Sequence, residues 1–307
     1  MSLRLDEIVG NDRARRLLKA SVFAAKKRSI TPPHALFIGP QGLGKTTLAK
    51  AIADELPSAT FQRVVGRVKT KHLSELLVGT TFRGDKITVL FWDEIHMISP
   101  TSVPILLVAM EEKQLQMPVG PDVITMNLGN FMLIGATTLP SRLARPLLDR
   151  FGLKIEVRLY SIEELVAIAL LEKENQFRFT QKALKEIAMR SRGTPRVMLA
   201  LTRNVSDTVD RQAGICKVKR AVAAMEGLEV YSHGLTPRDI EYIRALDSSR
   251  VASLRKLAAM TGHESQVLVI DIEPWLFKLG ALTITTGGRQ LTRRGRELVE
   301  QMESVEI

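Results

Sequence analysis

The sequence predicts an α/β protein with a parallel sheet sandwiched by helices, followed by a small all-helical domain and a domain of short helices with a β-hairpin. Three observations support this fold class. Short apolar runs alternate with amphipathic helical patterns up to residue 160, only helical patterns occur from there to residue 235, and a hairpin signal comes near the C-terminus. We therefore divide the chain into domains at residues 1–160, 161–235 and 236–307.

The first domain begins with a helical pattern and continues with five apolar runs that predict strands. The helical pattern covers residues 12–28, where Ala14, Leu18 and Val22 recur at helical spacing and basic residues occupy the other face. The expected strands are residues 35–38, 60–65, 88–92, 131–134 and 155–159. A helix over residues 46–55 is expected after the first strand, since parallel strands are joined by crossovers on the faces of the sheet.

The two later domains are both predicted from helical patterns, and only the last one ends in a hairpin signal. The expected helices of the second domain are residues 162–173, 181–191, 195–209 and 217–226. In the third domain, helices over 237–246, 253–260 and 265–279 precede a hairpin over 282–292, in which Gly287-Gly288 separates two β-rich runs. Three short helices and then a hairpin are typical of a winged-helix domain, a DNA-binding variant of the helix-turn-helix.

Composition and charge narrow the class of protein. The longest strongly apolar run, residues 87–92, is too short to span a bilayer, and the N-terminal residues carry no export signal. A single cysteine, Cys216, excludes an intrachain disulfide and a thiolate zinc site. These features predict a cytoplasmic protein. The formal net charge of +11 favours a polyanionic partner, of which nucleic acid is the commonest.

The strongest motif is a complete P-loop, Gly-Pro-Gln-Gly-Leu-Gly-Lys-Thr-Thr over residues 39–47, between a predicted strand and a predicted helix. Its glycines let successive backbone N–H groups and the helix N-terminus point at phosphate oxygens. Lys45 adds a positive charge, and the hydroxyl of Thr46 can bind Mg²⁺. The motif predicts ATP and Mg²⁺ binding by Gly39, Gly42, Leu43, Gly44, Lys45, Thr46 and Thr47.

A second motif places two carboxylates at the end of an apolar strand. Asp93 and Glu94 come directly after the run Val-Leu-Phe-Trp at residues 89–92. Beside a P-loop, such a pair supports hydrolysis: Asp93 holds Mg²⁺ through its shell, and Glu94 orients and polarises the attacking water. Without the P-loop, a simple turn at the end of a strand would explain the pair equally well.

Three further residues are candidates because of where they lie relative to these motifs. Thr138 comes after another buried strand and should deliver a polar side chain beside the γ-phosphate. Arg150 precedes the last strand and is a candidate arginine finger for ATP bound by a neighbouring subunit, and Arg196 at a helix start could reach the phosphates of its own subunit. Taken singly, the three are also explained as a turn, a surface arginine and a helix cap.

A basic stretch lies beside the predicted wing. Arg289, Arg293, Arg294 and Arg296 fall within eight residues that contain no acid. This pattern suits contact with DNA phosphates independent of sequence, as a motor that travels along DNA requires. A solvated charge run on a surface helix stays open, because residues 236–307 carry no net positive charge.

The P-loop, the Asp93-Glu94 pair and the segments that contain Thr138, Arg150 and Arg196 occur in the order and spacing of AAA+ ATPases. The sequence resembles the RuvB family in particular. Three stretches carry the resemblance: FIGPQGLGKTTLA at 37–49, LFWDEIHMIS at 90–99 and SRGTPR at 191–196. The similarity extends from about residue 5 to about residue 280. Gln41 and Trp92 stand where that family has smaller apolar or proline residues.

The resemblance implies further roles. Thr138 corresponds to sensor 1, Arg150 to the finger acting in trans, and Arg196 to sensor 2. Ile8, Val9 and Gly10 with Tyr160 would flank the adenine, and Pro195 would join the nucleotide contacts. The segment 113–130 corresponds to the hairpin by which RuvB engages its partner RuvA. Its apolar residues either form that contact surface or pack as in an ordinary hairpin: Leu115, Met117, Val119, Val123, Ile124, Met126 and Leu128.

These expectations support two functions. The first is an ATP-dependent DNA translocase that forms a hexameric ring and drives branch migration of Holliday junctions in recombination and repair. The second is a loader or nucleotide-switched scaffold that binds DNA without processive movement, since clamp loaders and initiators share the core motifs. The winged helix and the resemblance favour the motor.

Overall fold

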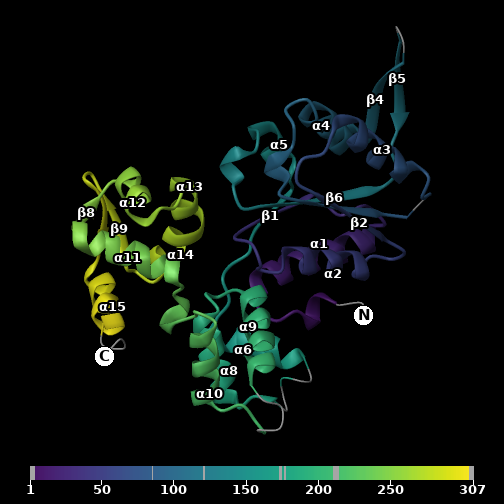
Figure 1. Ribbon diagram of the computed structural model, residues 1–307. Coiled ribbons are helices and arrows are strands. Elements are labelled where there is room, and N and C mark those ends of the chain that lie inside the picture. Colours follow the sequence, from purple (N-terminus) through teal and green to yellow (C-terminus); the bar gives the residue numbers. More distant parts are fainter. Residues whose placement is uncertain are drawn as a thin grey trace. The chain divides into compact units, whose positions relative to one another are not determined.

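The computed structural model describes residues 4–84, 86–119, 122–172, 175, 178–209 and 214–303 (Figure 1). The chain forms two compact units. The first extends to residue 168 and includes residues 194–196, and the second contains residues 169–193 and the chain from residue 197 onward. No helix in the described ranges is both long and apolar enough to cross a bilayer.

The first unit is built on a five-stranded parallel sheet with the order β2-β3-β6-β1-β7. Its strands are β1 (Ala35–Ile38), β2 (Thr60–Val65), β3 (Thr88–Asp93), β6 (Phe131–Thr137) and β7 (Leu153–Glu156). Every residue of β6 is buried, as expected of a central parallel strand covered on both faces. The α/β fold class predicted from the sequence is therefore confirmed.

The last strand differs from its prediction over residues 155–159. Strand β7 begins at Leu153 and ends at Glu156, because its partner β1 is only four residues long and pairs Ala35 with Leu153 and Ile38 with Glu156. Val157 and Tyr160 are buried but lie beyond this ladder. Apolar burial thus continues past the end of the strand, and the apolar pattern alone does not mark the boundary.

Helices cover both faces of this sheet. Figure 1 shows α1 (Asp12–Arg28) and α2 (Lys45–Glu55) on one face, and α3 (Thr70–Thr81), α4 (Val103–Glu112) and α5 (Arg145–Arg150) on the other. A continuous apolar core joins the second group of helices to the sheet, with contributions from Leu36, Trp92, Leu73, Leu106 and Leu147. This packing holds the carboxyl ends of the strands, where the candidate site lies, in a fixed arrangement.

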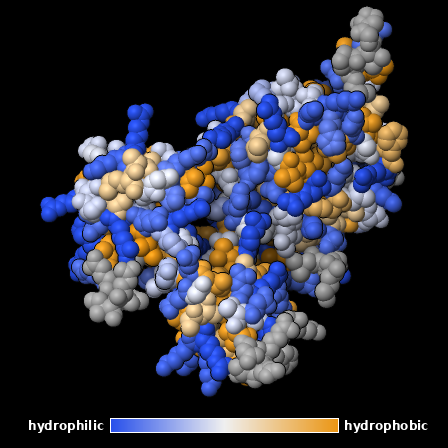
Figure 2. All heavy atoms as spheres, in the orientation of Figure 1, coloured by the Kyte–Doolittle hydropathy of each residue, from blue (hydrophilic) through white to orange (hydrophobic). Residues whose placement is uncertain are grey.

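An antiparallel hairpin projects from the first unit (Figure 1). It consists of β4 (Gln114–Val119) and β5 (Asp122–Asn127). Leu115 and Leu128 at its base pack into the core, whereas Val123 and Ile124 are 64% and 48% exposed. Hydrophobic atoms are accordingly visible on the hairpin surface (Figure 2). The side chains of Met117 and Val119 lie outside the described residues.

The chain between the parallel sheet and the winged helix, residues 162–227, contains the predicted helices. The helices are α6 (Ile162–Leu171), α8 (Gln181–Arg190), α9 (Pro195–Thr208) and α10 (Val218–Gly227). The predicted end of the first of these helices, residue 173, lies outside the described residues. Thr180 caps α8 by accepting a hydrogen bond from the backbone N–H of Ala183, which accounts for the position where that helix begins.

The C-terminal part of the second unit has the winged-helix fold. Its elements are α11 (Pro237–Ser249), β8 (Val251–Ala252), α12 (Leu254–Thr261), α13 (Ser265–Val267), α14 (Glu273–Lys278), β9 (Leu282–Thr285), β10 (Gly288–Leu291) and α15 (Arg293–Glu303). The strands form a sheet of order β8-β10-β9 around a core that contains Tyr242, Leu257, Leu276 and Leu291. Gly288 is the first residue of β10, so the turn is formed by Thr286 and Gly287 rather than by the two glycines.

One predicted helix of this fold, 265–279, is helical over residues 265–278 but not as a regular α-helix throughout. A π-helical stretch, Leu268–Ile272, separates α13 from α14. Pro274 lies in the first turn of α14 and has no backbone N–H to donate to the preceding turn, so the regular α-helical hydrogen bonding is lost there while the chain stays helical. The proline is evident in the sequence, but the apolar pattern continues across it.

Candidate nucleotide site

The P-loop leads into the N-terminus of α2, which has no side-chain cap. It connects β1 to α2, and the residue that precedes the helix, Gly44, offers no side chain to accept a hydrogen bond from the first N–H groups. Gly42 requires glycine for two reasons: its φ is +78°, and a Cβ there would lie 2.7 Å from Cγ2 of Thr194. The exposed N–H groups and the positive end of the helix dipole form an anion site.

Lys45 is held inside this curl. Its side chain is buried, and Nζ donates hydrogen bonds to the carbonyl oxygens of Gly39 at 2.6 Å and Pro40 at 2.8 Å. Burial lowers the pKa of Lys45, and the nearby carboxylates of Glu94 and Asp93 oppose that shift. The carbonyl oxygens that accept these hydrogen bonds are neutral, so they do not cancel the positive charge of the ammonium. The loop is therefore complementary to an anionic ligand such as a triphosphate.

Glu94 lies at the centre of a second group of side chains. Its backbone is left-handed, with φ +54°, directly after β3. Its Oε1 accepts a hydrogen bond from Nε2 of Gln41 at 3.4 Å, and its Oε2 accepts one from the hydroxyl of Thr138 at 3.3 Å and lies 3.1 Å from Nδ1 of His96. The structure thus brings together Glu94 and Thr138, which the sequence predicted, and adds Gln41 and His96, which it did not.

Asp93 faces a different neighbour. Nη2 of Arg63, on the edge strand β2, lies 2.7 Å from its Oδ2. Sequence reasoning missed Arg63, because no local motif links residue 63 to residue 93. The parallel register pairs Arg63 with Phe91, so Asp93 lies two positions further along the neighbouring strand and on the same face of the sheet.

The Asp93 carboxylate and the Thr46 hydroxyl suit a hard cation such as Mg²⁺, which takes oxygen ligands. In the described ranges no group of three or more His, Cys, Asp or Glu side chains could hold a metal alone. This donor set therefore fits Mg²⁺ bound jointly with phosphate oxygens and water rather than in a cage of protein ligands.

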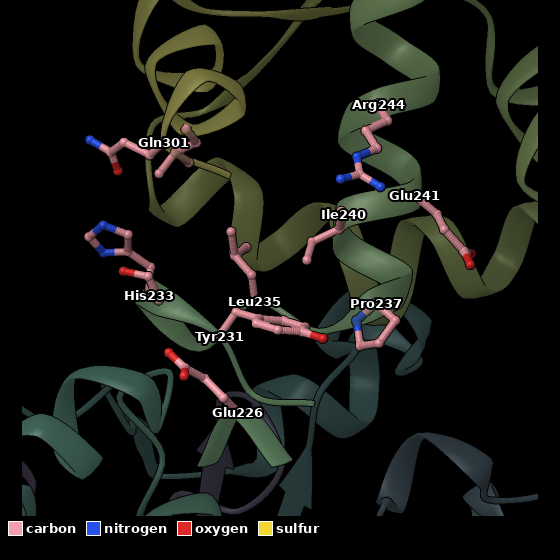
Figure 3. Close-up of a pocket in the computed structure, with 11 residues that line it drawn as sticks. Glu226, Tyr231, His233, Leu235, Pro237, Ile240, Glu241, Arg244 and Gln301 are labelled. Atoms are coloured by element: carbon pink, nitrogen blue, oxygen red, sulfur yellow. The ribbon is translucent and has the colours of Figure 1, made fainter. Parts of the chain in front are cut away.

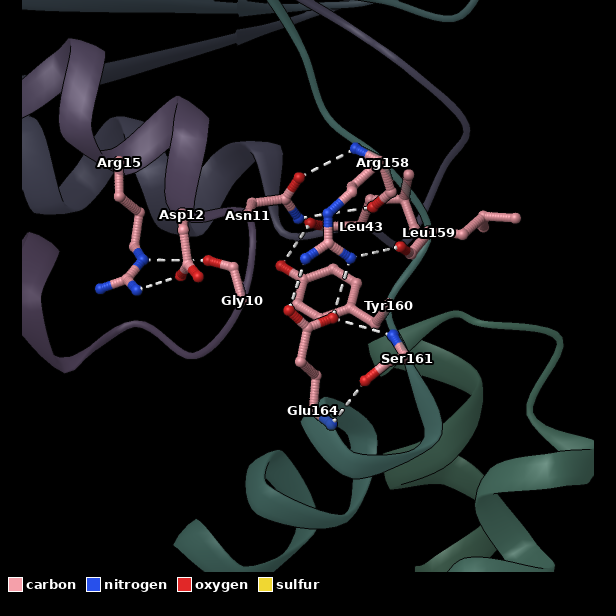
Figure 4. A network of polar contacts seen from close by, with 10 residues as sticks. All are labelled: Gly10, Asn11, Asp12, Arg15, Leu43, Arg158, Leu159, Tyr160, Ser161 and Glu164. Carbon is pink, nitrogen blue, oxygen red and sulfur yellow. Dashed lines mark hydrogen bonds and ion pairs between the residues drawn. The ribbon is translucent and has the colours of Figure 1, made fainter.

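Tyr160 connects the N-terminal segment to the P-loop (Figure 4). Its hydroxyl donates a hydrogen bond to the carbonyl oxygen of Leu43 at 3.1 Å, and its ring lies so close to Gly10 that a Cβ there would be 2.7 Å from Cε1. Burial raises the pKa of this tyrosine, so the hydroxyl stays protonated and remains a donor. Ile8, buried, and Val9, partly buried, precede this contact in the chain.

The two candidate arginines have different positions. Arg196 belongs to the first unit, where its backbone N–H donates to the carbonyl oxygen of Gly42 at 3.3 Å, directly beside the P-loop. Arg150, at the end of α5, forms an ion pair with Glu111, with Nη2 2.6 Å from Oε2, and its side chain is nearly half exposed. Arg196 is thus part of the P-loop neighbourhood, whereas Arg150 has its own carboxylate partner on the surface.

The basic stretch of the winged helix separates into two groups. Arg289 is only 18% exposed, and its Nε lies 2.9 Å from Oε1 of Glu273, a carboxylate that also accepts a hydrogen bond from Tyr242. The guanidinium of Arg289 is thus used inside the domain, and its predicted contact with DNA stays a prediction. Arg293, Arg294 and Arg296 lie instead on the exposed surface of α15, not on the wing.

The second unit also contains a cavity of about 450 Å³ (Figure 3). The residues that line it include the apolar or aromatic side chains of Tyr231, Leu235 and Ile240 and the charged side chains of Glu241 and Arg244. None of the residues predicted for nucleotide or DNA binding lines this cavity.

The fold and the site together define a P-loop ATPase of the AAA+ class. Three parts of the chain match families of known proteins: residues 2–157 match "Holliday junction DNA helicase RuvB P-loop domain", residues 160–231 "RuvB AAA lid domain", and residues 232–300 "RuvB C-terminal winged helix domain". The chain belongs to the RuvB family.

Full-length relatives agree with this assignment. The Holliday junction branch migration complex subunit RuvB of Wolinella succinogenes is 36% identical over 302 residues, which cover 95% of this chain and 89% of the relative. The corresponding subunit of Campylobacter hominis is 32% identical and covers 96% of this chain and 88% of its own length. The solved structure of the Thermotoga maritima RuvB Holliday junction branch migration motor has a TM-score of 0.83 at 32% identity, with 97% of each chain covered.

Proposed function

We propose that this protein is an ATP-driven motor that moves duplex DNA and promotes branch migration of Holliday junctions. The observation that carries the proposal is the pairing of Glu94 with Thr138 beside a P-loop, in a chain that also contains a winged helix with three exposed arginines. Membership of the RuvB family supports it. We propose the division at 1–160, 161–235 and 236–307 as an ATPase domain, a lid domain and a DNA-binding domain, in a cytoplasmic protein.

In the proposed reaction, the chain's own residues position ATP and the attacking water. The N–H groups of the P-loop and Lys45 bind the phosphates, while Glu94 orients and polarises the water that attacks the γ-phosphorus. Thr138 donates a hydrogen bond to the Glu94 carboxylate and would contact the γ-phosphate. Thr46 and Asp93 would hold Mg²⁺, which, when bound, neutralises the phosphate charge.

The remaining nucleotide contacts are proposed from position. Ile8, Val9 and Tyr160 would enclose the base, since Tyr160 already joins the N-terminal segment to Leu43. Pro195 and Arg196 would approach the phosphates beside Gly42. The full proposed set is Ile8, Val9, Gly39, Gly42, Leu43, Gly44, Lys45, Thr46, Thr47, Tyr160, Pro195 and Arg196.

Arg150 would act on a neighbouring subunit's ATP in a homo-oligomeric ring, a hexamer by resemblance. This role requires Arg150 to exchange its partner Glu111 for the phosphates, which is feasible for a half-exposed ion pair of small net stability. The hairpin residues Val123 and Ile124 offer a contact for a RuvA-like partner, since they are exposed while Leu115 and Leu128 anchor the base.

The DNA contacts are assigned to Arg293, Arg294 and Arg296. Arginines on an exposed helix bind phosphates without reading bases, which a translocating protein requires. A strand-displacement assay on a four-way DNA junction tests the proposal. ATP-dependent conversion of the junction to duplex products, with or without a RuvA-type partner, is expected. ATP turnover without displacement would exclude the motor and leave the loader function.

A further inference from the structure

The ATPase domain carries a second cationic surface, at the carboxyl end of β2. Between Glu55 and Glu75 the sequence contains no acidic residue but four cations, Arg63, Arg67, Lys69 and Lys71. Three of these cations, Arg63, Arg67 and Lys69, line a hollow of about 410 Å³. We call these three residues the β2 cluster.

Packing directs the β2 cluster toward solvent. Val64 and Val68 are buried in the core, and the residues that alternate with them, Arg63, Arg67 and Lys69, are exposed. Among the described residues, Arg67 and Lys69 form no ion pair, so their charges are available to a ligand. A concave surface with two unpaired cations, a third paired with Asp93, and no Asp or Glu in its own segment suits successive phosphates of a polyanion.

This loop is attached directly to the strand that carries Asp93. The indole N–H of the fully buried Trp92 donates to the carbonyl oxygen of Gly66 at 2.9 Å, and the N–H of Gly66 donates to the carbonyl oxygen of Asp93 at 2.9 Å. Arg63 adds the side-chain contact to Asp93. The loop is therefore joined to the candidate Mg²⁺-binding carboxylate through Arg63, and to the strand that carries it through the two hydrogen bonds of Gly66.

We propose that the β2 cluster binds the phosphodiester backbone of duplex DNA, and that bound phosphates compete with Asp93 for Arg63. The inference rests on the proposed function, because it supplies a route by which DNA acts on the nucleotide site. Arg63 is a positioning residue in this scheme: paired with Asp93 it occupies one oxygen of that carboxylate, and paired with a phosphate it releases that oxygen.

The binding part is tested with Arg67→Gln/Lys69→Gln in the full-length protein. Affinity for a random-sequence DNA duplex is measured by fluorescence anisotropy over a series of salt concentrations, with a non-hydrolysable ATP analogue present. Loss of two phosphate contacts should reduce the slope of log affinity against log salt by about 2. Lys26→Gln/Lys27→Gln, on the exposed end of α1, removes the same charge and should keep the wild-type slope.

Equal slopes for the two double variants would overturn the proposal. The proposal would also be overturned if only the wild type bound inorganic phosphate while the variant kept its affinity for duplex DNA. The β2 cluster would then be a site for a small anion. Thermal unfolding of each variant checks that the fold is intact. If the wild-type protein promotes branch migration but Arg67→Gln/Lys69→Gln keeps the wild-type salt dependence, only this inference is rejected. If the wild-type protein neither binds duplex DNA nor promotes branch migration, both this inference and the proposed function are rejected.

The coupling part is tested by Mg²⁺ titration of the binding of a fluorescent ATP analogue. Arg63→Gln should lower the half-saturating Mg²⁺ concentration by about two- to fivefold, since a partly exposed ion pair no longer engages Asp93. Saturating duplex should shift the wild type toward that value and leave Arg63→Gln unchanged, while Arg63→Lys should keep the response. An Arg63→Gln protein with the wild-type Mg²⁺ dependence and the wild-type response to duplex would overturn the coupling.

Discussion

The hydroxyl of Thr138 donates a hydrogen bond to Oε2 of Glu94 at 3.3 Å, although the two residues are 44 positions apart. Each lies just past the end of a parallel strand, Glu94 after β3 and Thr138 after β6, and these strands are neighbours in the sheet. Parallel strands deliver their carboxyl ends to one edge, so two separate motifs become one site.

Glu94→Gln should therefore separate binding from hydrolysis. The amide still fills the same space but cannot polarise water, so ATP turnover should fall by about 10²- to 10⁴-fold. Affinity for a fluorescent ATP analogue should change by less than about twofold, because the phosphate contacts remain. Turnover is measured by phosphate release, with Glu112→Gln on the exposed end of α4 as the control. Retained turnover would remove Glu94 from its proposed role.

Lys45→Ala should act on binding. Loss of a charged donor to the phosphates, about 1.5–3 kcal/mol, corresponds to roughly 10- to 100-fold weaker affinity for the ATP analogue. Lys50→Ala, at an exposed position of the same helix, removes the same charge and should bind as the wild type does. If both variants bound equally well, the P-loop would not hold the triphosphate through Lys45.

Arg150→Ala should bind ATP but lose about 10³- to 10⁵-fold in turnover, the range for an arginine finger. Arg145→Ala, on the same helix, serves as the control. Mixing Arg150→Ala with Glu94→Gln subunits should restore part of the activity, since some interfaces then contain both intact groups. The absence of recovery in verified mixed rings would place Arg150 outside the neighbouring site.

The pair of Arg289 and Glu273 should be structural. Glu273 is nearly inaccessible, so Arg289→Met leaves a buried carboxylate unpaired and should cost about 3–5 kcal/mol in the free energy of unfolding of the winged helix. Adding Glu273→Gln should recover part of that loss, measured by denaturant unfolding. Arg293→Met, at a position 92% exposed, should cost less than about 1 kcal/mol. The opposite ranking would restore Arg289 as a surface residue.

His34 should make the ATPase domain sensitive to acid. Burial lowers its pKa from 6.5 to about 4, and its Nδ1 accepts a hydrogen bond from the N–H of Leu133 at 2.8 Å, which requires that nitrogen to be unprotonated. The stability contributed by neutral His34 is complete above pH 6.5 and is lost as the pH falls toward 4, up to about 3 kcal/mol. His34→Gln should flatten this part of the pH–stability profile, whereas His72→Gln, at an exposed position, should not. Parallel profiles for all three proteins would contradict the assignment.

Much of the candidate site was predictable because its chemistry is contiguous in the chain. The P-loop, the Asp93-Glu94 pair and strands β1 and β2 each depend on neighbouring residues, whose spacing alone prescribes a turn, a helix start or a buried strand. The π-helical stretch before Pro274 and the short strand β7 were less predictable, because the apolar pattern continues unchanged through both.

Local order along the chain accounts for the motifs, the winged helix and the presence of a candidate catalytic carboxylate. Three-dimensional packing assigns partners: Arg63 to Asp93, Arg289 to Glu273, and Gln41 to Glu94. The reason is physical. A motif acts through residues adjacent in the chain, whereas the partner of a charged side chain depends on strand register and burial among residues tens of positions away, and no short stretch of sequence contains that information.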